Sequence, residues 1–173
     1  MCAKAVKQRV PKSAQQALAS LMRECAKAER STGDARRLMA RWEVAKQDQE
    51  GVLNQLIEMK FIDNRRFAQA YVRDKVNLSG WGAQRISLEL SRKGVERDII
   101  DEAMADLDKE AMAERLKSAL SKRRRTLKYK DQYDLKNKLM RYGASLGYDY
   151  SMVRDAIAEV TQNEEAECSD FYF

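Results

Sequence analysis

Histidine is absent from this chain of 173 residues, and proline occurs only at Pro11. Without histidine the chain lacks the commonest general base and metal ligand, which lowers the expectation of an enzyme. No stretch approaches the roughly 18 apolar residues that a membrane span needs. No apolar core of a signal peptide follows the basic start. We therefore expect a cytoplasmic, non-enzymatic protein that uses no cofactor and contacts no membrane.

Cysteine is scarce and scattered. Cys2, Cys25 and Cys168 lie far apart in the sequence. An odd, dispersed set is not a disulfide framework and lacks the spacing of metal ligands. These residues are expected to be free thiols in a reducing compartment.

What the chain does contain favours helices. It is 44% hydrophobic and 35% charged, with seven glycines. Ala, Leu, Lys, Arg, Glu and Gln are abundant, and these residues have high helix propensity. Runs of Val, Ile and Thr that would build strands are missing. The composition predicts an all-α fold.

Two segments repeat the same helical pattern. Residues 99–107 (IIDEAMADL) and 152–160 (MVRDAIAEV) both place apolar residues at i, i+3, i+4 and i+7, the stripe of an amphipathic helix. Gly94 and Gly147 precede them at matching positions. Glycine just past a helix end readily adopts the left-handed conformation. A helix is therefore predicted to end near each glycine, with another helix after it.

Capping residues are predicted at several helix starts. Asp98 and Ser151 stand at matching positions as N-caps of the two similar helices. Ser13, followed three residues later by Gln16, predicts a capping box that opens the first helix.

The repeat extends over most of the chain. In the first unit, Leu38 and Trp42 are interpreted as the counterparts of Ile86 and Leu90 in the second. Three-helix units of this size bury little core alone, so neighbours should stack into an elongated, curved body with a concave face. The predicted organisation is a basic N-terminal tail (1–13), three three-helix repeats (14–63, 64–108 and 109–160) and an acidic, aromatic C-terminal tail (161–173), whose end at Phe171-Tyr172-Phe173 is expected to be disordered.

Positive charge is concentrated late in the chain. The net charge is +6, and between Arg115 and Arg141 only Asp131 and Asp134 oppose a dense set of Lys and Arg residues. A basic block followed by an acidic end indicates a polyanionic partner without identifying it.

Two segments resemble a known family. Residues 61–72 (FIDNRRFAQAYV) and 80–95 (GWGAQRISLELSRKGV) are similar to the middle repeat of RecX proteins, in which an aspartate pair precedes Phe-Ala, and a Gly-aromatic-Gly turn precedes Arg-Ile and a Lys-Gly-Ile ending. Arg30-Ser31 resembles the family's opening of the second helix. Asn64 replaces the usual second aspartate, and Asp34-Ala35 stands where Glu-Leu is usual.

The resemblance covers residues 14–160 and implies a function. RecX proteins are tandem three-helix repeats without catalytic activity that bind RecA, lie in the groove of the RecA–DNA filament and suppress its ATPase, strand-exchange and co-protease activities. The resemblance therefore implies a RecA-binding regulator that also contacts DNA, and we expect it to act as a monomer. The alternative is a general DNA-binding helical module that affects RecA only indirectly.

The candidate contact residues for RecA or DNA are basic and are expected to point outward from the predicted helices. One group surrounds the first two helices of the middle repeat, and the other follows the basic block. They are Arg73, Lys75, Arg85, Arg92 and Lys93 in the first group, and Lys122, Arg123, Arg124, Arg125, Lys128, Lys130, Lys136, Lys138 and Arg141 in the second.

Each feature also has a purely structural interpretation. Cations near Arg124 could simply complement the dipole of a helix C-terminus, and the middle group could be ordinary surface charge. Trp81 could stack on a base or pack on the following helix. Tyr129, Tyr133 and Tyr150 have no clear core position and could contact a partner.

Overall fold

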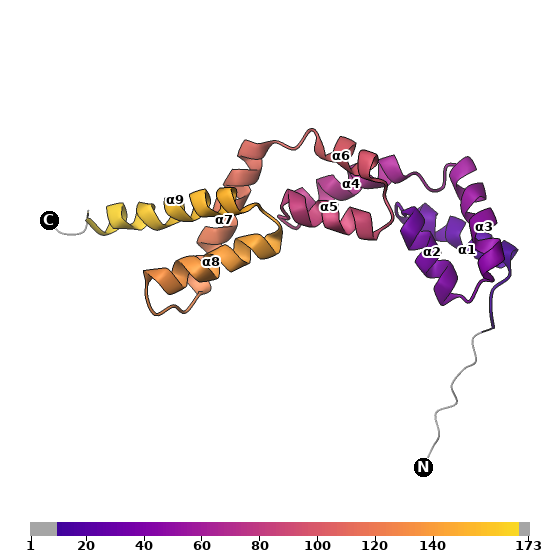
Figure 1. The fold of residues 1–173 in the computed structure, drawn as a ribbon, viewed down its shortest axis with the longest axis horizontal. Coiled ribbons are helices and arrows are strands. Elements are labelled where there is room, and N and C mark those ends of the chain that lie inside the picture. Colours follow the sequence, from indigo (N-terminus) through magenta and orange to yellow (C-terminus); the bar gives the residue numbers. More distant parts are fainter. Residues whose placement is uncertain (1–9, 170–173) are drawn as a thin grey trace, which may run out of the picture.

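The structure, a computed structural model, describes residues 10–169, which form nine α-helices and no strand. The all-α class is therefore confirmed. The helices follow one another as three groups of three along a curved, elongated body (Figure 1). The groups are α1 (Ala14–Lys27), α2 (Thr32–Arg41) and α3 (Lys46–Glu58); α4 (Asn64–Asn77), α5 (Ala83–Arg92) and α6 (Arg97–Met104); and α7 (Lys109–Thr126), α8 (Gln132–Leu146) and α9 (Tyr150–Ser169).

Each group of three helices has its own hydrophobic core. Leu21, Met39 and Leu56 are fully buried in the first group. Ile86 and Leu90 are fully buried in the second. Burying one such side chain contributes about 1.5–3 kcal/mol. Three separate small cores, rather than one large core, therefore stabilise the body. Other buried core residues of the second and third groups include Ile100, Leu116, Leu135, Leu139 and Val153.

The alignment of the first repeat with the second was wrong by three residues, a little less than one helical turn. The buried residues of α2 are Ala35 and Met39, whereas Leu38 and Trp42 are only partly buried. The reason is where the helix starts. Its N-cap is Ser31, so the residues four and eight positions later face the core, as Ile86 and Leu90 do after the N-cap Gly82.

The Ser13 capping box is confirmed: its side chain accepts a hydrogen bond from the Gln16 N–H, and the Gln16 side chain accepts one from the Ser13 N–H. The left-handed glycines are also confirmed, with φ of 74° at Gly94 and 88° at Gly147.

The predicted N-caps Asp98 and Ser151 were wrong because both helices begin earlier than expected. The N-cap of α6 is Glu96, which leaves Asp98 in the first turn, where its charge still complements the helix dipole. In α9 the Asp149 carboxylate accepts hydrogen bonds from the Met152 N–H and from the Ser151 hydroxyl.

Consecutive repeats meet end to end through their middle helices. At the junction of the first two repeats, the Gly33 N–H donates a 3.0 Å hydrogen bond to the carbonyl of Lys93, the C-cap of α5. The Ser31 hydroxyl donates to the same carbonyl at 2.8 Å. A side chain on Gly33 would collide with this carbonyl. The C-terminus of α5 therefore docks against the N-terminus of α2.

The second junction repeats the first. The Gln84 N–H donates to the carbonyl of Gly147 at 3.0 Å, and the Gly82 N–H donates to that of Leu146 at 2.7 Å. Gly82 and Gly147 approach so closely that a Cβ on Gly82 would strike the Gly147 carbonyl group. Helices α8, α5 and α2 thus form one head-to-tail series along the concave side of the body, here called the helix row (Figure 1). Each junction satisfies main-chain groups that a helix end leaves unpaired.

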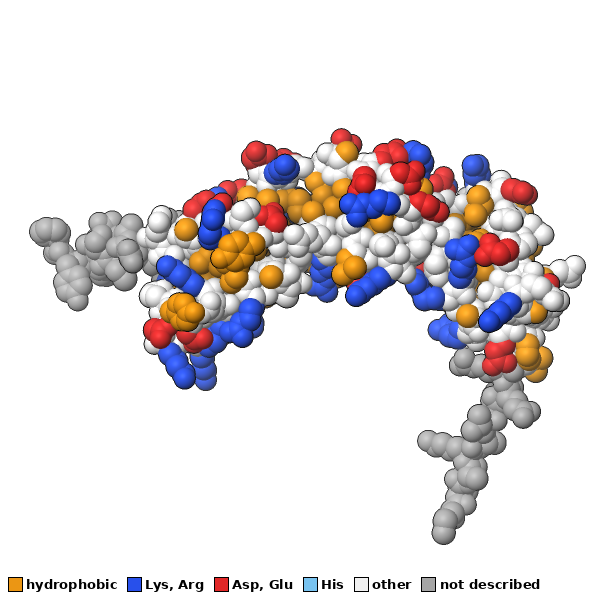
Figure 2. All heavy atoms as spheres, in the orientation of Figure 1, with side chains coloured by type: hydrophobic (Ala, Val, Ile, Leu, Met, Phe, Trp, Pro, Cys, Tyr) orange, Lys and Arg blue, Asp and Glu red, His pale blue; other side chains and the backbone are white. Residues whose placement is uncertain are grey.

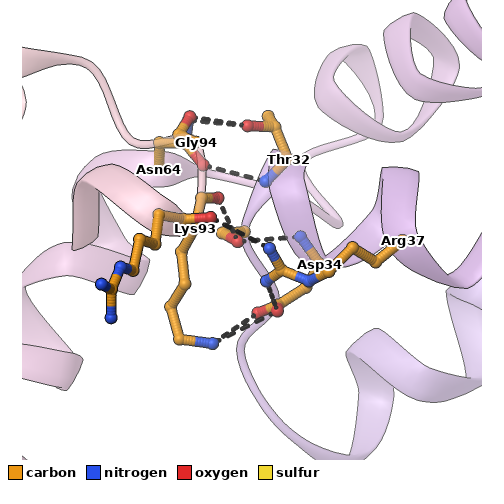
Figure 3. A network of polar contacts seen from close by, with 8 residues as sticks. Thr32, Asp34, Arg37, Asn64, Lys93 and Gly94 are labelled. Atoms are coloured by element: carbon orange, nitrogen blue, oxygen red, sulfur yellow. Dashed lines mark hydrogen bonds and ion pairs between the residues drawn. The ribbon is translucent and has the colours of Figure 1, made fainter. Parts of the chain in front are cut away.

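The buried side chain of Asn64 reinforces the first junction (Figure 3). Its Oδ1 accepts from the Thr32 N–H at 3.1 Å, while its Nδ2 donates to the Gly94 carbonyl at 3.3 Å and to Glu96 Oε2 at 2.9 Å. A carboxylate could accept but could not donate. The amide at this position, a departure from the RecX-like pattern, therefore fits a site that needs both functions.

The last helix continues past the predicted end of the third repeat, and Lys12, just before the first repeat, contacts it. The segment 161–173 was expected to be a tail, but α9 continues through Ser169. Residues 161–169 contain no glycine or proline and are rich in helix formers. Phe171-Tyr172-Phe173 lies outside the described residues. At the other end, the Lys12 N–H donates to the Trp42 carbonyl, and its ammonium lies 3.7 Å from the centre of the Trp42 ring.

No helix in residues 10–169 combines the length and apolarity needed to cross a bilayer.

Candidate interaction surface

Positive charge collects on the concave side of the body. In Figure 2, Lys and Arg side chains lie along the lower edge, beneath α8, α5 and α2, while most Asp and Glu side chains in this view lie along the upper, convex edge. The lower edge is the side of the helix row. An elongated partner of negative charge would meet this side first.

In the middle repeat, two of the candidate cations are held by one tryptophan. The guanidinium carbon of Arg85 lies 4.0 Å from the centre of the Trp81 ring, and the ammonium of Lys75 lies 4.9 Å from it. Trp81 itself is half-buried and packs against the core of this repeat, including Tyr71. Trp81 therefore packs within its repeat, but its ring contacts Tyr71 of the preceding helix α4, whereas the prediction placed it on the following helix. Its ring face fixes both cations in place, a favourable cation–π arrangement.

The remaining cations of this group differ in availability. Arg73 is 73% exposed and lies 4.0 Å from Asp74. Arg92 is 65% exposed and pairs with Glu89 one turn away. Lys93 instead turns inward, 3.2 Å from Asp34 of the first repeat, so it holds the junction together (Figure 3). Among these three, Arg73 and Arg92 are the ones that a partner can reach freely.

The run of cations at the end of α7 is interrupted by burial. Arg124 is only 9% exposed, and its Nη1 donates a 2.7 Å hydrogen bond to the carbonyl of Val160. It therefore ties α7 to α9 and does not lie on the surface with its neighbours. Helical geometry explains this, because consecutive residues point in different directions around the axis. Lys122, Arg123 and Arg125 remain exposed.

A groove between the second and third repeats brings several of these groups together. It has a volume of about 480 Å³ and lies between the end of α4 and the side of α7. Arg115, Lys122 and Arg123 line it, with Tyr142 and Asn77. The Asn77 Oδ1 accepts a 2.9 Å hydrogen bond from Arg115. The described lining carries three cations and no carboxylate, so the groove suits an anion.

In the third repeat, the loop after α7 and the exposed side of α8 supply the last candidates. Lys128, Lys130, Lys136 and Arg141 are exposed. Lys138 is only part-exposed, because its ammonium bonds Asp134 at 2.7 Å and the Lys128 carbonyl at 2.8 Å. The Lys138 bond and the Lys130 N–H together lower the pKa of Asp134. Lys138 therefore shapes the loop rather than facing a partner.

Two basic residues on the same surfaces, Arg37 and Arg115, were not among the predicted contact residues, although Arg115 opens the basic block. Arg37 of α2 is about half-exposed and donates to the Arg92 carbonyl at 3.0 Å, which extends the charged surface across the first junction. Arg115 lines the groove between repeats. The signal that could have found Arg37 is its place midway between the buried residues Ala35 and Met39, which directs its side chain away from the core.

Two family models match this chain. One, described as the second three-helix domain of RecX, matches residues 63–104, and one described as the third three-helix domain matches residues 110–157. The chain is 30% identical over 111 residues to the "Regulatory protein RecX" of Clostridium botulinum (strain Eklund 17B / Type B), covering 63% of this chain and 51% of the relative. The chain is 31% identical over 110 residues to the "Regulatory protein RecX" of Mycobacterium sp. (strain JLS). That match covers 61% of this chain and 60% of the relative. The chain spans about half the length of the first curated relatives it matches.

Two solved structures share the fold. The crystal structure of RecX from Lactobacillus salivarius superposes with a TM-score of 0.71 at 19% identity, covering 86% of this chain and 97% of that chain. A crystal structure of regulatory protein RecX superposes with a TM-score of 0.76 at 22% identity, covering 84% of this chain and 73% of that chain. These similarities support the tandem arrangement of three-helix units.

Proposed function

This chain belongs to the RecX family of regulatory proteins, and from that premise we propose that it binds the RecA recombinase on DNA and restrains it. The protein lies in the groove of the RecA–DNA filament, bridges neighbouring subunits and inhibits the recombinase, ATPase and co-protease activities. It acts as a cytoplasmic monomer by binding alone, without a catalytic step or a cofactor.

The observation that carries the proposal, together with family membership, is the charged helix row. Its three helices follow one another along the concave side, and Lys and Arg side chains gather beneath all three (Figure 2). A filament repeats the same surface along its length, so a body made of successive repeats can contact several subunits. Charge on such a surface speeds association and fixes orientation more than it adds affinity.

The proposal is tested by titrating the protein into RecA on single-stranded DNA while ATP hydrolysis is measured. We expect the rate to fall at protein concentrations well below that of RecA, because one bound molecule at a filament site affects growth beyond it. An unchanged rate over the whole titration with the cognate RecA would reject the proposal.

Two arginines of the middle repeat give a matched pair for this assay. Arg92 on α5 and Arg97 on α6 are both exposed, and each pairs with a carboxylate about one turn away. Arg92 belongs to the helix row and Arg97 does not. Arg92→Ala should weaken inhibition, and Arg97→Ala should leave it unchanged. Equal effects of the two variants would mean that the helix row is not the contact surface.

A second candidate function is general DNA binding, which the exposed cations at the end of α7 favour. Neutralising a phosphate releases counterions and makes binding depend on salt. The double variant Arg123→Ala/Arg125→Ala should reduce DNA affinity and lower the salt slope by roughly one for each phosphate that is no longer neutralised. If this variant loses inhibition of RecA but keeps its DNA affinity and slope, RecA contact is favoured and general DNA binding is not.

A further inference from the structure

The tip formed by the α7–α8 loop and the first turn of α8 combines exposed aromatic rings with exposed positive charge. Tyr133 is 78% exposed and Tyr129 is 43% exposed. Burying such a ring normally contributes substantially to stability, and neither is buried here. Lys128 and Lys130 flank Tyr129 in the sequence and are exposed as well. Figure 2 shows exposed hydrophobic side chains at the lower left, where this loop lies, with Lys and Arg as well as Asp and Glu side chains beside them.

The two acidic residues of the tip are engaged within it. The Asp131 carboxylate accepts a 2.7 Å hydrogen bond from the Asp134 N–H and so caps α8. The Asp134 carboxylate accepts from the Lys130 N–H at 3.1 Å and from the Lys138 ammonium at 2.7 Å. Asp134 is partly buried and Asp131 is exposed, so the exposed Lys and Arg side chains outnumber the exposed carboxylates at the tip. The exposed side chains of Arg125, Lys128, Lys130 and Lys136 make no ion pair within the described part of the chain.

The same bonds make the loop a fixed platform. The Lys138 ammonium joins Asp134 to the Lys128 carbonyl, at 2.7 and 2.8 Å, so it ties the loop to α8 from both sides of Tyr129. A binding surface that is already ordered loses less conformational entropy when a ligand arrives. The rings are thus presented by a loop that needs little rearrangement.

We propose that this tip binds an unpaired nucleic-acid strand, with bases stacking on Tyr133 and Tyr129 and phosphates meeting the surrounding lysines. Exposed aromatic rings beside a cationic surface are the combination that single strands require, since every unpaired base offers a face for stacking. A duplex keeps its bases stacked on one another, so it would engage the cations alone. The inference rests on the proposed function for the presence of DNA, and it adds the choice of single strands.

The test compares three variants of the full chain by fluorescence anisotropy, using a labelled oligothymidylate strand and a mixed-sequence duplex of equal length. Tyr133→Leu should weaken binding of the single strand by roughly five- to fifty-fold and leave binding of the duplex unchanged. Lys130→Gln should weaken both. Tyr150→Leu is the matched control, because Tyr150 is 69% exposed but lies at the start of α9, and it should change neither.

Circular dichroism of each variant confirms that the helices are intact. The proposal is overturned if Tyr133→Leu and Tyr150→Leu bind the single strand equally well, or if Tyr133→Leu weakens strand and duplex alike. RecA is absent from this assay. If the predicted loss of single-strand binding is not observed while the natural chain still inhibits RecA, strand binding at this tip is rejected and the regulatory proposal stands.

Discussion

The ammonium of Lys93 lies 3.2 Å from the carboxylate of Asp34, across the junction between the first and second repeats. The two side chains are 24% and 16% exposed, so water screens this pair less than it screens an ordinary surface ion pair. Burial opposes ionisation of Asp34, but hydrogen bonds from Arg37 and Lys93 and the charge of Lys93 outweigh it and lower the pKa of the carboxyl. Charge therefore contributes to holding these repeats together.

Removing this charge should destabilise the protein. Asp34→Asn keeps the shape of the side chain but loses the attraction to Lys93 across the junction and to Arg37 within α2, and we expect the free energy of unfolding to fall by about 1 kcal/mol. Urea denaturation measures the change. Asp74→Asn is the control, because the Asp74 carboxylate is 59% exposed and 4.0 Å from Arg73. Equal losses in the two variants would contradict a role for the junction pair.

The same pair predicts a dependence on pH. A carboxyl whose pKa is lowered by folding stabilises the folded state above its unfolded pKa of about 4, and that contribution is lost as the pH falls through the lowered pKa. The stability difference between the natural chain and Asp34→Asn should therefore be full at neutral pH and shrink toward zero below pH of about 4. Urea midpoints at a series of pH values measure it. A difference that stays constant into strong acid would contradict the assignment.

Gly82 should be intolerant of a side chain. A Cβ there would strike the Gly147 carbonyl, so Gly82→Ala must push the third repeat away from the second. We expect a loss of about 1–3 kcal/mol in stability and a change in the small-angle X-ray scattering profile. Gly51→Ala provides the contrast. Gly51 lies inside α3 with open space around it, and alanine favours helix by about 1 kcal/mol. A tolerated Gly82→Ala would mean that the junction opens without cost.

Arg124 and Arg125 should behave differently although they are adjacent. Arg124→Met leaves the Val160 carbonyl without its charged donor, and we expect a loss of about 2 kcal/mol in the free energy of unfolding. Arg125→Met changes an exposed residue and should stay within about 0.5 kcal/mol of the natural chain. Thermal unfolding of both variants decides the point, and equal stabilities would contradict the structural role of Arg124.

The sequence was sufficient for the helices and their repetition, because apolar spacing and glycine position are local signals. Gly94 and Gly147 have the left-handed conformation that their positions required. Helix starts were harder: Glu96 precedes the more familiar capping residue Asp98, so residue preference alone put the start too late. The continuation of α9 past Val160 was missed because acidic residues suggested a tail, although nothing there breaks a helix.

The candidate surface was harder to predict than the fold. The position of a cation in the sequence does not show which way its side chain points. The orientations of the Lys93, Arg124 and Lys138 side chains depend on partners distant in the chain or on where each residue lies around its helix. Arg37 was missed because its neighbour across the junction, Arg92, lies on another repeat. Such pairings depend on how repeats stack, which no local pattern encodes.

Because Gln84 and Gly147, like Gly33 and Lys93, are joined through main-chain atoms, this part of each coupling does not depend on the side chains at the outer positions, provided that Gly33 and Gly82 are kept at the contacts. Substitutions on the outer positions of each unit can accumulate without altering the arc that the units describe. In such a chain, surface charge can change by substitution as the partner changes, while the overall curvature of the body stays the same.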